Sequence, residues 1–246
     1  MQLIILASGR GSRLGRSRTS SKLFLEIYSG KTIFSIISKI FNLFHSVIIV
    51  FGYKFFTNKK KVENIKKIKL VRNRKYSTTN MVESLFLSKK KVNSSVVIVY
   101  SDIVFDLAII KKIVQIKGSV IPLNKAWQKL WKQRMNKKNI IKDAEDLKTK
   151  NGYLISIGNK IKKKLPKSQF MGIIKLTLSD YNKLYKFYKS LKDKRIQFTH
   201  FLDKSLSEKV IKLKYKNFNK LWAEVDTSKD LNVAKKIFKN ELSNSN

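Results

Sequence analysis

In the first half of the chain, short apolar runs alternate with segments in which apolar residues recur at helical spacing. The uninterrupted runs are typical of strands buried on both faces of a parallel sheet. These runs are Gln2–Ala7, Val47–Phe51, Ile68–Val71 and Ser95–Tyr100. Helices are predicted over Ile33–Phe44, Asn80–Ser88 (with Asn80 as its amino-terminal cap) and Val104–Ile116. The alternation predicts a parallel sheet with helices on both faces.

The second half of the chain is less regular. Its apolar runs predict strands over Gly118–Leu123, Tyr153–Ile157, Phe170–Leu176, Val210–Lys214 and Trp222–Val225. Helices are expected over Asp180–Leu191 and over Ser228–Asn240, with Ser228 as the cap of the second. The polar tail Glu241–Asn246 is expected to fray. Since no proline- or glycine-rich linker divides the chain, we interpret residues 1–246 as one domain.

The composition suits a folded α/β protein and excludes several kinds of chemistry. With 246 residues, 43% of them hydrophobic, the chain is long enough to bury a sizeable core. It has no cysteine, which excludes disulfides, thiolate metal sites and a cysteine nucleophile. No basic segment precedes the first apolar run, so the start of the chain does not resemble a signal peptide. No apolar run is long enough to span a bilayer, and a cytoplasmic location is expected.

The net charge of +38 is the unusual property of this composition. It would suit a polyanionic partner such as nucleic acid or an acidic membrane surface. The alternative is compositional drift, because the lysines are spread along the chain and accompany abundant isoleucine and asparagine. Only the run Lys162–Lys164 falls close to a plausible site. Under either interpretation the charge would attract a nucleoside triphosphate, and no specific nucleic acid is expected as a partner.

Three segments with candidate chemistry directly follow predicted strands: Ser8–Gly15, Gly52-Tyr53 and Ser101-Asp102. In parallel α/β sheets the ligand binds beyond the carboxyl ends of the strands, so these segments are expected to face one crevice. This convergence is a stronger indication of a site than any one of the three segments.

The first of these segments is suited to binding phosphate. It contains Gly9, Gly11 and Gly15, with Arg10 and Arg13 between them, and Lys22 follows. A glycine-rich turn lets backbone N–H groups close on phosphate oxygens, while arginine and lysine add positive charge. The pattern is neither a Walker A loop nor a dinucleotide fingerprint. An ordinary turn with surface arginines is the alternative.

Two predicted strands end in carboxylates, where a buried apolar run has little reason to finish. Asp102 follows the strand that ends at Tyr100, and Asp226 follows Trp222–Val225, with Glu224 just before it. Two carboxylates that converge on a triphosphate would make a Mg²⁺ site. The alternative is that each caps the helix after it, although Thr227 and Ser228 compete with Asp226 for that role.

The segment LASGRGSRLG with Ser21-Lys22-Leu23 resembles the signature of the nucleoside-diphosphate-sugar pyrophosphorylase superfamily. The resemblance implies a three-layer α/β/α Rossmann-like nucleotidyltransferase fold with a predominantly parallel mixed sheet. In that superfamily the segment wraps the phosphates of a nucleoside triphosphate, and a lysine after it contacts the α-phosphate. That lysine usually follows proline, whereas here Ser21 precedes Lys22.

Six further blocks are similar to the phosphocholine and 2-aminoethylphosphonate cytidylyltransferase branch of this superfamily. They are Thr78–Phe86, Tyr100–Phe105, Trp127–Arg134 with Asp143–Glu145, Gln169–Lys175, Phe198–Leu202 (with His200 where the branch has aspartate) and Trp222–Thr227. With the glycine-rich segment they cover nearly the whole chain. The resemblance implies transfer of a nucleoside monophosphate, CMP from CTP, to a small phosphorylated or phosphonylated acceptor such as phosphocholine or 2-aminoethylphosphonate. Pyrophosphate would be released, and Mg²⁺ would be the cofactor.

The resemblance and the residue chemistry together predict the site. Lys22, Arg13, Asp102 and Asp226 are expected to be catalytic, with the two aspartates as ligands of Mg²⁺. The expected nucleotide-binding residues are Ala7, Gly9, Arg10, Gly11, Gly52, Tyr53, Asn80 and Ser101. The expected acceptor-binding residues are Trp127, Trp131, Glu145, Lys160, Phe170, Gly172 and Glu224. Residues 1–117 would mainly bind the nucleotide, and residues 118–240 would mainly bind the acceptor.

An amino or choline-like head group would suit an aromatic wall through cation–π attraction. The candidates for this wall are Trp127, Trp131, Tyr153 and Phe170, with Asp143, Glu145 or Glu83 as counter-charge. The alternative is that the two tryptophans, four residues apart on a helix, pack into the core. No general base is required, because an ionised phosphate oxygen is already a nucleophile. His45 is therefore expected to be structural, and His200 is not expected to act as a base.

Three functions remain open from the sequence. The first is the cytidylyltransferase, and the second is a sugar-1-phosphate nucleotidyltransferase that uses UTP, dTTP or CTP. The third is a basic nucleic-acid-binding module on an inactive nucleotidyltransferase fold. Asp102 and Asp226 argue against the third, since nucleic-acid binders seldom place carboxylates at the centre of a basic site. The oligomeric state stays open, and a homodimer is compatible with the sequence.

Overall fold

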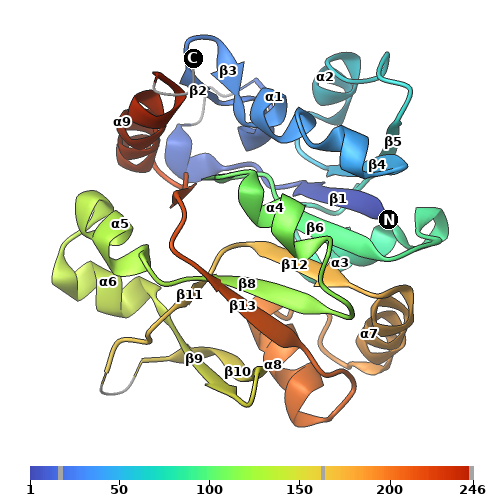
Figure 1. Cartoon of the computed structure of the whole chain (residues 1–246). Helices are drawn as coiled ribbons and strands as arrows, with labels where there is room; N and C mark the ends of the chain where they lie inside the picture. Colours follow the sequence, from blue (N-terminus) through green and yellow to red (C-terminus); the bar gives the residue numbers. More distant parts are fainter. Residues whose placement is uncertain (16–18, 162–163, 244–246) are drawn as a thin grey trace.

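The computed structural model describes residues 1–15, 19–161 and 164–243, and a ten-stranded sheet runs through both halves of the chain (Figure 1). Its strand order is β5-β4-β1-β6-β12-β8-β13-β10-β9, and β11 pairs with β8 at the side of this path. The amino-terminal half supplies one end of the sheet, and the carboxy-terminal half supplies the other.

Four neighbouring strands of the first half are parallel. They are β5 (Ile68–Arg72), β4 (Ser46–Phe51), β1 (Gln2–Ala7) and β6 (Val96–Tyr100). Every residue of β1 and β4 is buried, because helices cover both faces of this part of the sheet. The uninterrupted apolar runs therefore predicted these strands correctly, and the bounds of β1 match the prediction.

The second half of the chain adds strands in both directions. They are β8 (Val120–Asn124), β9 (Glu145–Lys150), β10 (Tyr153–Lys160), β11 (Gln169–Phe170), β12 (Ile173–Leu176) and β13 (Lys214–Phe218). The strands β12, β10 and β11 are antiparallel to their neighbours, whereas β13 is parallel to β8. Since the other strands of the sheet share one direction, the predicted mostly parallel mixed sheet is confirmed.

Helices pack on both faces of the sheet, which gives three layers. Those on one face are α1 (Ile33–Ser38), α4 (Ala108–Ile113), α5 (Trp127–Arg134) and α9 (Ser228–Ser243). Those on the other face are α3 (Met81–Leu87), α7 (Leu178–Ser190) and α8 (Phe198–Ser207). Alternate residues of β1 enter the two cores: Leu3 and Ile5 pack with the first set, and Ile4 and Leu6 with the second. The short helices α2 (Phe55–Lys60) and α6 (Lys137–Asp143) complete the set.

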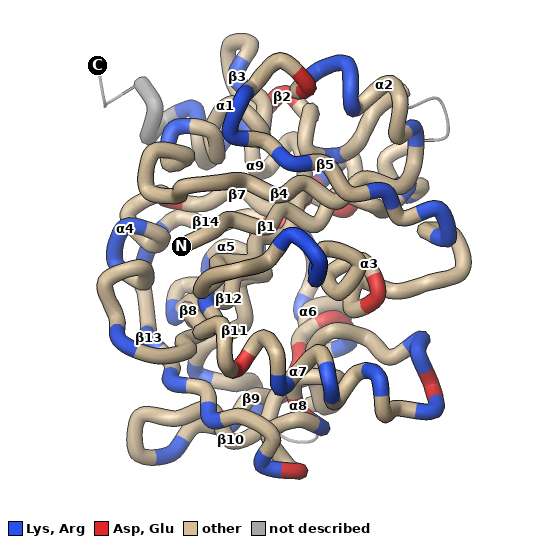
Figure 2. The backbone as a smooth tube through the Cα atoms, turned by 90° about the vertical axis from the view of Figure 1, so that its right-hand side faces the viewer, with Lys and Arg blue, Asp and Glu red and all other residues tan. Residues whose placement is uncertain are grey.

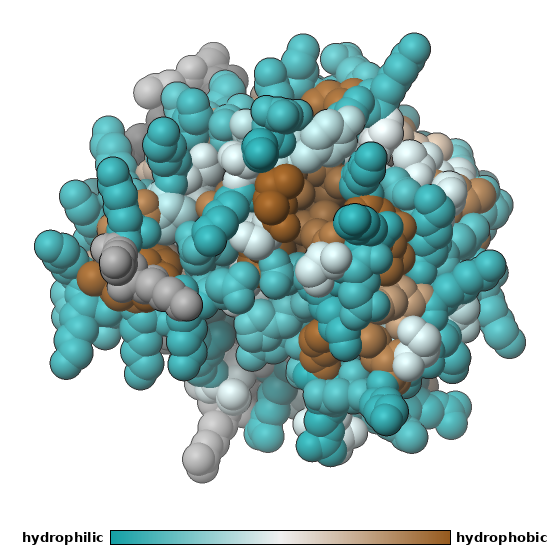
Figure 3. Space-filling view, turned by 90° about the horizontal axis from the view of Figure 1, so that it is seen from below, coloured by the Kyte–Doolittle hydropathy of each residue, from teal (hydrophilic) through white to brown (hydrophobic). Residues whose placement is uncertain are grey.

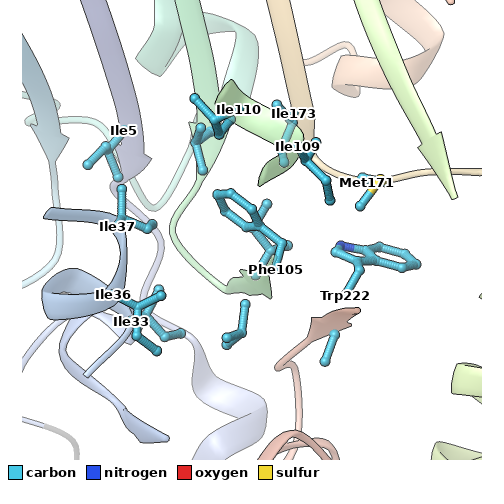
Figure 4. Close-up of a cluster of buried hydrophobic side chains, with 14 of the residues drawn as sticks. Ile5, Ile33, Ile36, Ile37, Phe105, Ile109, Ile110, Met171, Ile173 and Trp222 are labelled. Atoms are coloured by element: carbon cyan, nitrogen blue, oxygen red, sulfur yellow. The ribbon is translucent and has the colours of Figure 1, made fainter. Parts of the chain in front are cut away.

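A two-stranded antiparallel sheet packs within the first core. It pairs β7 (Ile103–Phe105) with β14 (Trp222–Glu224). Figure 4 shows Phe105 and Trp222 among isoleucines of β1, α1, α4 and β12. The prediction of one helix over Val104–Ile116 is therefore wrong at its start. Val104 and Phe105 pair with β14 in a strand, and α4 begins only at Ala108. A second small sheet pairs β2 (Glu26–Tyr28) with β3 (Lys31–Thr32).

Other predicted bounds also differ from the structure. The helix predicted over Ile33–Phe44 ends at Ser38 as α1, and a separate 3-10 turn, Phe41–Leu43, follows it. The run Phe170–Leu176 is split by Gly172, whose φ of 72° ends β11 and lets β12 begin at Ile173. Of Val210–Lys214, only Lys214 lies in a strand, because hydrogen bonding to β8 begins there. Thr227 rather than Ser228 caps α9, since its hydroxyl accepts from the N–H of Asp230. That helix continues to Ser243, through half of the tail expected to fray, and residues 244–246 lie outside the described residues.

The surface is dominated by positive charge. Lys and Arg positions occur on most elements in Figure 2 rather than on one arm. In Figure 3 apolar residues gather near the middle of the face, between hydrophilic side chains, and Ile155 of β10 is among the exposed apolar residues of the protein. Folded proteins commonly expose some apolar surface of this kind. Over the described residues, no helix combines the length and the apolar character needed to cross a membrane.

Candidate active site

Two cavities open at the carboxyl ends of β1 and β6. The small cavity has a volume of about 260 Å³, and its lining includes Gly9, Gly11, Ser12, Lys22, Ser101 and Asp102. The large cavity has a volume of about 550 Å³ and lies toward the second half of the chain. Arg13, Met81 and Asp226 line both cavities, so ligands in the two would meet beside these residues.

The glycine-rich segment Ser8–Gly15 forms one rim of the small cavity. Gly11 has a φ of 64°, a left-handed conformation that glycine adopts without strain, and the short 3-10 helix Ser12–Leu14 follows it. This turn brings Gly9, Gly11 and Arg13 to the cavity. The backbone is therefore exposed where a phosphate would be bound.

Several of the expected nucleotide-binding residues lie within or directly beside the glycine-rich segment, on the side away from the cavities. Tyr53 donates its N–H to the carbonyl oxygen of Ser8 at 3.0 Å. A Cβ on Gly52 would lie only 2.7 Å from the same oxygen, so the close approach requires glycine. Ala7 is fully buried, and the Arg10 guanidinium lies 5.8 Å from the centre of the Tyr53 ring. None of these four residues is in the described lining of either cavity.

Lys22 enters the small cavity from a 3-10 turn, Lys22–Phe24, that is held by its neighbours. The Ser21 hydroxyl accepts from the N–H of Leu23, and the Ser21 N–H donates to Oδ1 of Asn58 at 2.9 Å. Asn58 is fully buried on α2 and donates in turn to the carbonyl oxygen of Tyr53 at 2.8 Å. The amide of Asn58 thus connects the turn that carries Lys22 with the support of the glycine-rich segment.

The ammonium group of Lys22 lies between two carboxylates. Its Nζ is 3.1 Å from Oδ2 of Asp102 and 2.7 Å from Oδ1 of Asp226. Arg13 approaches the same oxygen of Asp226 at 3.0 Å. Burial alone would lower the pKa of Lys22, but the two carboxylates outweigh it and raise that pKa. The structure therefore brings together Lys22, Arg13, Asp102 and Asp226.

The pairing of β7 with β14 explains how Asp226 reaches Asp102 across the sequence. Glu224 is opposite Ile103 in this antiparallel pair, and the N–H of Val225 donates to the carbonyl oxygen of Asp102 at 2.7 Å. Asp226 is the next residue along the chain. Asp102 is followed by β7 rather than by a helix, so it is not an amino-terminal cap.

A buried arginine that the sequence analysis did not single out lies beside these carboxylates. Arg134 of α5 donates through Nε to Asp230 at 2.8 Å, and its Nη1 is 3.5 Å from Glu224. The other oxygen of Asp230 accepts from the N–H groups of Asp226 and Thr227. Arg134 thereby connects α5 with the backbone that carries Asp226. Its only sequence signal was the position of an arginine on the tryptophan-containing helix.

Aromatic side chains form much of the wall of the large cavity. Phe170 and Phe198 stack with ring centres 6.5 Å apart, and Tyr100 meets both of them edge to face. Trp131 and Trp222 stack on another part of the wall at 6.2 Å. Gly172 allows the chain to pass close to the ring of Tyr100, since a Cβ there would lie 2.9 Å from it. Of the predicted acceptor-binding residues, Trp131, Phe170 and Gly172 line this cavity, and Tyr100, Phe198 and Trp222 line it without having been predicted as site residues.

The same cavity is acidic, although the protein carries a charge of +38. Its described lining has Arg13 as the one Lys or Arg side chain, together with four carboxylates: Asp143, Glu145, Glu224 and Asp226. Burial raises the pKa of Glu145 above its ordinary value, and a hydrogen bond from Thr199 at 2.7 Å partly offsets the increase. Burial and the charges of Asp226 and Asp102 likewise raise the pKa of Glu224, to about 8, so near neutral pH the negative charge of the cavity comes mainly from the other three acidic side chains. This wall is suited to a cationic group.

Four residues that were candidates for binding the acceptor are not in the described lining of the large cavity. Trp127 is fully buried in the first core, where its indole N–H donates to the carbonyl oxygen of Pro166. Lys160 is exposed at the end of β10, outside the lining of the large cavity. Tyr153 is also partly exposed on β10, and Glu83 accepts a hydrogen bond from Tyr188. Of the run Lys162–Lys164, residues 162 and 163 lie outside the described residues.

The two histidines are not in the described lining of either cavity. The Nε2 atom of His200 lies 2.8 Å from the carbonyl oxygen of Gly158, and Nδ1 of His45 lies 3.2 Å from the amino terminus. Asn80, an expected nucleotide-binding residue, does line the large cavity, at the start of α3. Its amide donates to the carbonyl oxygen of Arg195 instead of capping the helix.

Comparisons with known proteins agree with this arrangement. Residues 3–121 match the family described as the MobA-like NTP transferase domain. The CTP:phosphoglutamine cytidylyltransferase of Campylobacter jejuni is 30% identical over an alignment 258 residues long, gaps included. The alignment covers 95% of this chain and 98% of the relative. The chain belongs to the nucleotidyltransferase superfamily, in its cytidylyltransferase branch, and is a nucleotidyltransferase.

Two solved structures share the fold at lower sequence identity. The inositol-1-phosphate CTP transferase from T. maritima is 21% identical with a TM-score of 0.75, covering 96% of this chain and 95% of the other. A putative glucose-1-phosphate thymidylyltransferase from Bacillus anthracis is 18% identical with a TM-score of 0.72, covering 96% and 94%. The Rossmann-like nucleotidyltransferase fold predicted from the sequence is thereby confirmed.

Proposed function

We propose that this protein transfers CMP from CTP to a small phosphorylated or phosphonylated acceptor that carries an amine. The nucleotide would occupy the small cavity, and the acceptor would occupy the large one. The observation that carries the acceptor class is the acidic and aromatic lining of the large cavity in a strongly basic protein. The names of the relative and of one structural neighbour, both of which include CTP, support the choice of nucleotide.

The proposed reaction is an in-line displacement at the α-phosphorus of CTP. An ionised oxygen of the acceptor forms the new P–O bond, and pyrophosphate leaves with the electron pair of the bond that breaks. No proton has to be removed from the nucleophile, so the reaction depends on alignment and on neutralisation of charge. Lys22 and Arg13, which line the small cavity, would offset the charge that develops on the α-phosphate and on pyrophosphate.

We also propose that Asp102 and Asp226 hold Mg²⁺. The donor set fits a hard cation, because both carboxylates contact one ammonium group and Oδ1 of Asp102 is buried without a hydrogen-bond partner. No group of three candidate ligand side chains is found among the described residues, so phosphate oxygens and water would supply the remaining ligands. The bound ion would neutralise charge on the triphosphate.

The acceptor amine would be bound by carboxylates and aromatic rings. Glu145 and Asp143 lie on the wall of the large cavity, and Phe170 and Trp131 present aromatic rings there. An ammonium group gains both ion pairing and cation–π attraction in such surroundings. Phosphoglutamine, the acceptor in the name of the relative, has an amine, as do 2-aminoethylphosphonate and, in quaternary form, phosphocholine. We propose one of these three as the acceptor.

The second candidate is a sugar-1-phosphate nucleotidyltransferase, in line with the name of the thymidylyltransferase neighbour. A neutral sugar can stack on aromatic rings, but it does not need the four carboxylates of the large cavity. This difference in charge favours the amine acceptor.

The test is pyrophosphate release across a grid of CTP, UTP, dTTP and ATP against the three amine acceptors and two sugar 1-phosphates. We expect turnover that requires a divalent cation, with CTP preferred and an amine acceptor at least tenfold better than either sugar phosphate. Equal turnover with UTP or dTTP would remove the cytidylyl assignment. Preference for a sugar phosphate would favour the second candidate.

A further inference from the structure

The contacts of Lys22 have a consequence for metal binding. Its ammonium group is 2.7 Å from Asp226 and 3.1 Å from Asp102, and the residue is 8% exposed. These are the two carboxylates proposed as metal ligands. The lysine therefore lies between them, where a cation shared by both carboxylates would have to lie.

Lys22 and a divalent cation compete for the same pair of carboxylates. Mg²⁺ requires its ligand oxygens at about 2.0–2.1 Å, whereas Lys22 already occupies Oδ1 of Asp226 and Oδ2 of Asp102. Arg13 adds a second positive charge beside Oδ1 of Asp226 at 3.0 Å. A metal ion entering this arrangement would have to displace the ammonium group and would meet two like charges.

The chain permits this displacement without moving the backbone. The turn that carries Lys22 is fixed by Ser21 and Asn58, but the ammonium group is at the end of a flexible four-carbon side chain. Lys22 also lines the small cavity beside the glycine-rich segment. Phosphate oxygens bound there would offer the ammonium group an alternative set of negative charges.

We propose that Lys22 blocks the metal site in the free protein and that binding of the nucleotide opens it. The triphosphate draws the ammonium group away from Asp102 and Asp226, and the freed carboxylates then accept the divalent cation. This inference rests on the proposed function of the two cavities. Its consequence is that the free protein binds divalent cations weakly, and that nucleotide and cation strengthen the binding of each other by the same factor.

The test measures Mn²⁺ binding through the electron paramagnetic resonance signal of the free ion, in the absence of any acceptor. The wild-type protein and the Lys22→Met and Lys22→Gln variants are each titrated with and without CTP. We expect the wild type to bind Mn²⁺ at least tenfold more tightly with CTP than without it. Without CTP, both variants should bind Mn²⁺ at least tenfold more tightly than the wild type does.

Two controls separate this effect from a general change in charge. Lys220→Met removes a lysine from the ion pair with Asp106, at 3.0 Å, and should leave Mn²⁺ binding unchanged. Asp226→Asn, introduced into Lys22→Met, should abolish the gain. Circular dichroism verifies that each variant folds. If neither Lys22 variant does, the wild-type titrations still test the inference, after the Mn²⁺ that CTP binds by itself in a protein-free titration is subtracted.

Equal Mn²⁺ affinity of the wild type and the Lys22 variants without CTP would overturn the inference, whether binding is tight or weak. Wild-type binding that is already tight without CTP would do the same. Pyrophosphate release by the wild-type protein is measured in parallel. If turnover is normal while Lys22 has no effect on Mn²⁺ binding, only the inference fails; if no NTP and acceptor give turnover, the proposed function fails.

Discussion

The two halves of the sheet build their parts of the site in different ways. In the parallel half, the residues beside the small cavity come from segments that directly follow strands: Ser8–Gly15 after β1, and Ser101-Asp102 after β6. In the other half, α5, β9, β11, α8 and β14 supply most of the wall of the large cavity, and Asn80, Tyr100 and Ile103 are among the residues of the first half that complete it. In the parallel half, strand direction determines where the functional side chains lie. In the second half, their positions depend on how elements far apart in the sequence pack together.

The halves also differ in charge. The small cavity combines Lys22 and Arg13 with two aspartates, while the large cavity has four carboxylates against Arg13 in its described lining. The general positive charge of the protein therefore does not determine the charge of each cavity. This difference predicts that variants of the two cavities should affect different kinetic constants.

The largest effects are expected at the boundary of the small cavity. We expect Lys22→Ala, Asp102→Asn and Asp226→Asn each to lower kcat about 100- to 1,000-fold, the range for loss of one group that stabilises a developing charge. Lys22→Ala should change kcat more than the KM for CTP, and the two aspartate variants should raise the Mg²⁺ concentration needed for half-maximal rate.

The measurement is steady-state pyrophosphate release. If the three residues act on one transition state, a double variant should lose much less than the product of the single losses. Near-normal turnover in any single variant would remove that residue from the catalytic group.

A second large effect is expected at the buried ion pair of Arg134 and Asp230, which joins α5 to the start of α9. Both side chains are buried, and Asp230→Asn would place an amide donor or an uncharged oxygen against a guanidinium that keeps only its longer contact with Glu224. We expect the free energy of unfolding to fall by about 3 kcal/mol, as for other broken buried ion pairs. Urea unfolding measures it. The exposed pair of Lys204 and Glu208, at 3.8 Å, is the control, and Lys204→Met should change stability by less than about 0.5 kcal/mol.

The same difference between the halves explains how much could be predicted from the sequence. An uninterrupted apolar run such as Gln2–Ala7 predicts a buried strand. The polar residues and glycines that follow the run then mark the carboxyl end of that strand, at the edge of the sheet. The nearness of Asp226 to Asp102 depends on pairing between β7 and β14, more than a hundred residues apart, which no local pattern encodes. Sequence spacing also could not decide which tryptophan of α5 faces the cavity, since Trp127 and Trp131 are one turn apart on the same side of the helix.

A smaller effect is expected in the large cavity. Glu145→Gln removes a carboxylate from its wall, and we expect the KM for the amine acceptor to rise about tenfold, as for loss of one partner of a charged hydrogen bond. The KM for CTP should change much less. Lys160→Ala is the matched control, because Lys160 lies outside this cavity, and it should leave both constants unchanged.

The pH dependence sharpens this prediction. Burial raises the pKa of Glu145, so its negative charge is lost at a higher pH than for an exposed glutamate. In the wild type, kcat/KM for the acceptor should therefore decline as the pH falls through this raised pKa. Glu145→Gln should lack that decline. An unchanged acceptor KM would make Glu145 a structural carboxylate that holds only Thr199.

The smallest effect is expected at Ser21, where the superfamily usually has proline. Its φ of −58° already suits proline, and its N–H donates to the buried Oδ1 of Asn58. Ser21→Pro removes this hydrogen bond and the hydroxyl that accepts from the N–H of Leu23, but it restricts the unfolded chain, and we expect a net loss of about 1 kcal/mol in unfolding free energy. Asn58→Leu alone should cost more, because it leaves the buried N–H of Ser21 without a partner. In the Ser21→Pro background that N–H is absent, so the same change should cost about 1 kcal/mol less, as urea unfolding of all four proteins would measure. Additive losses would mean that Asn58 stabilises this half through Tyr53 alone.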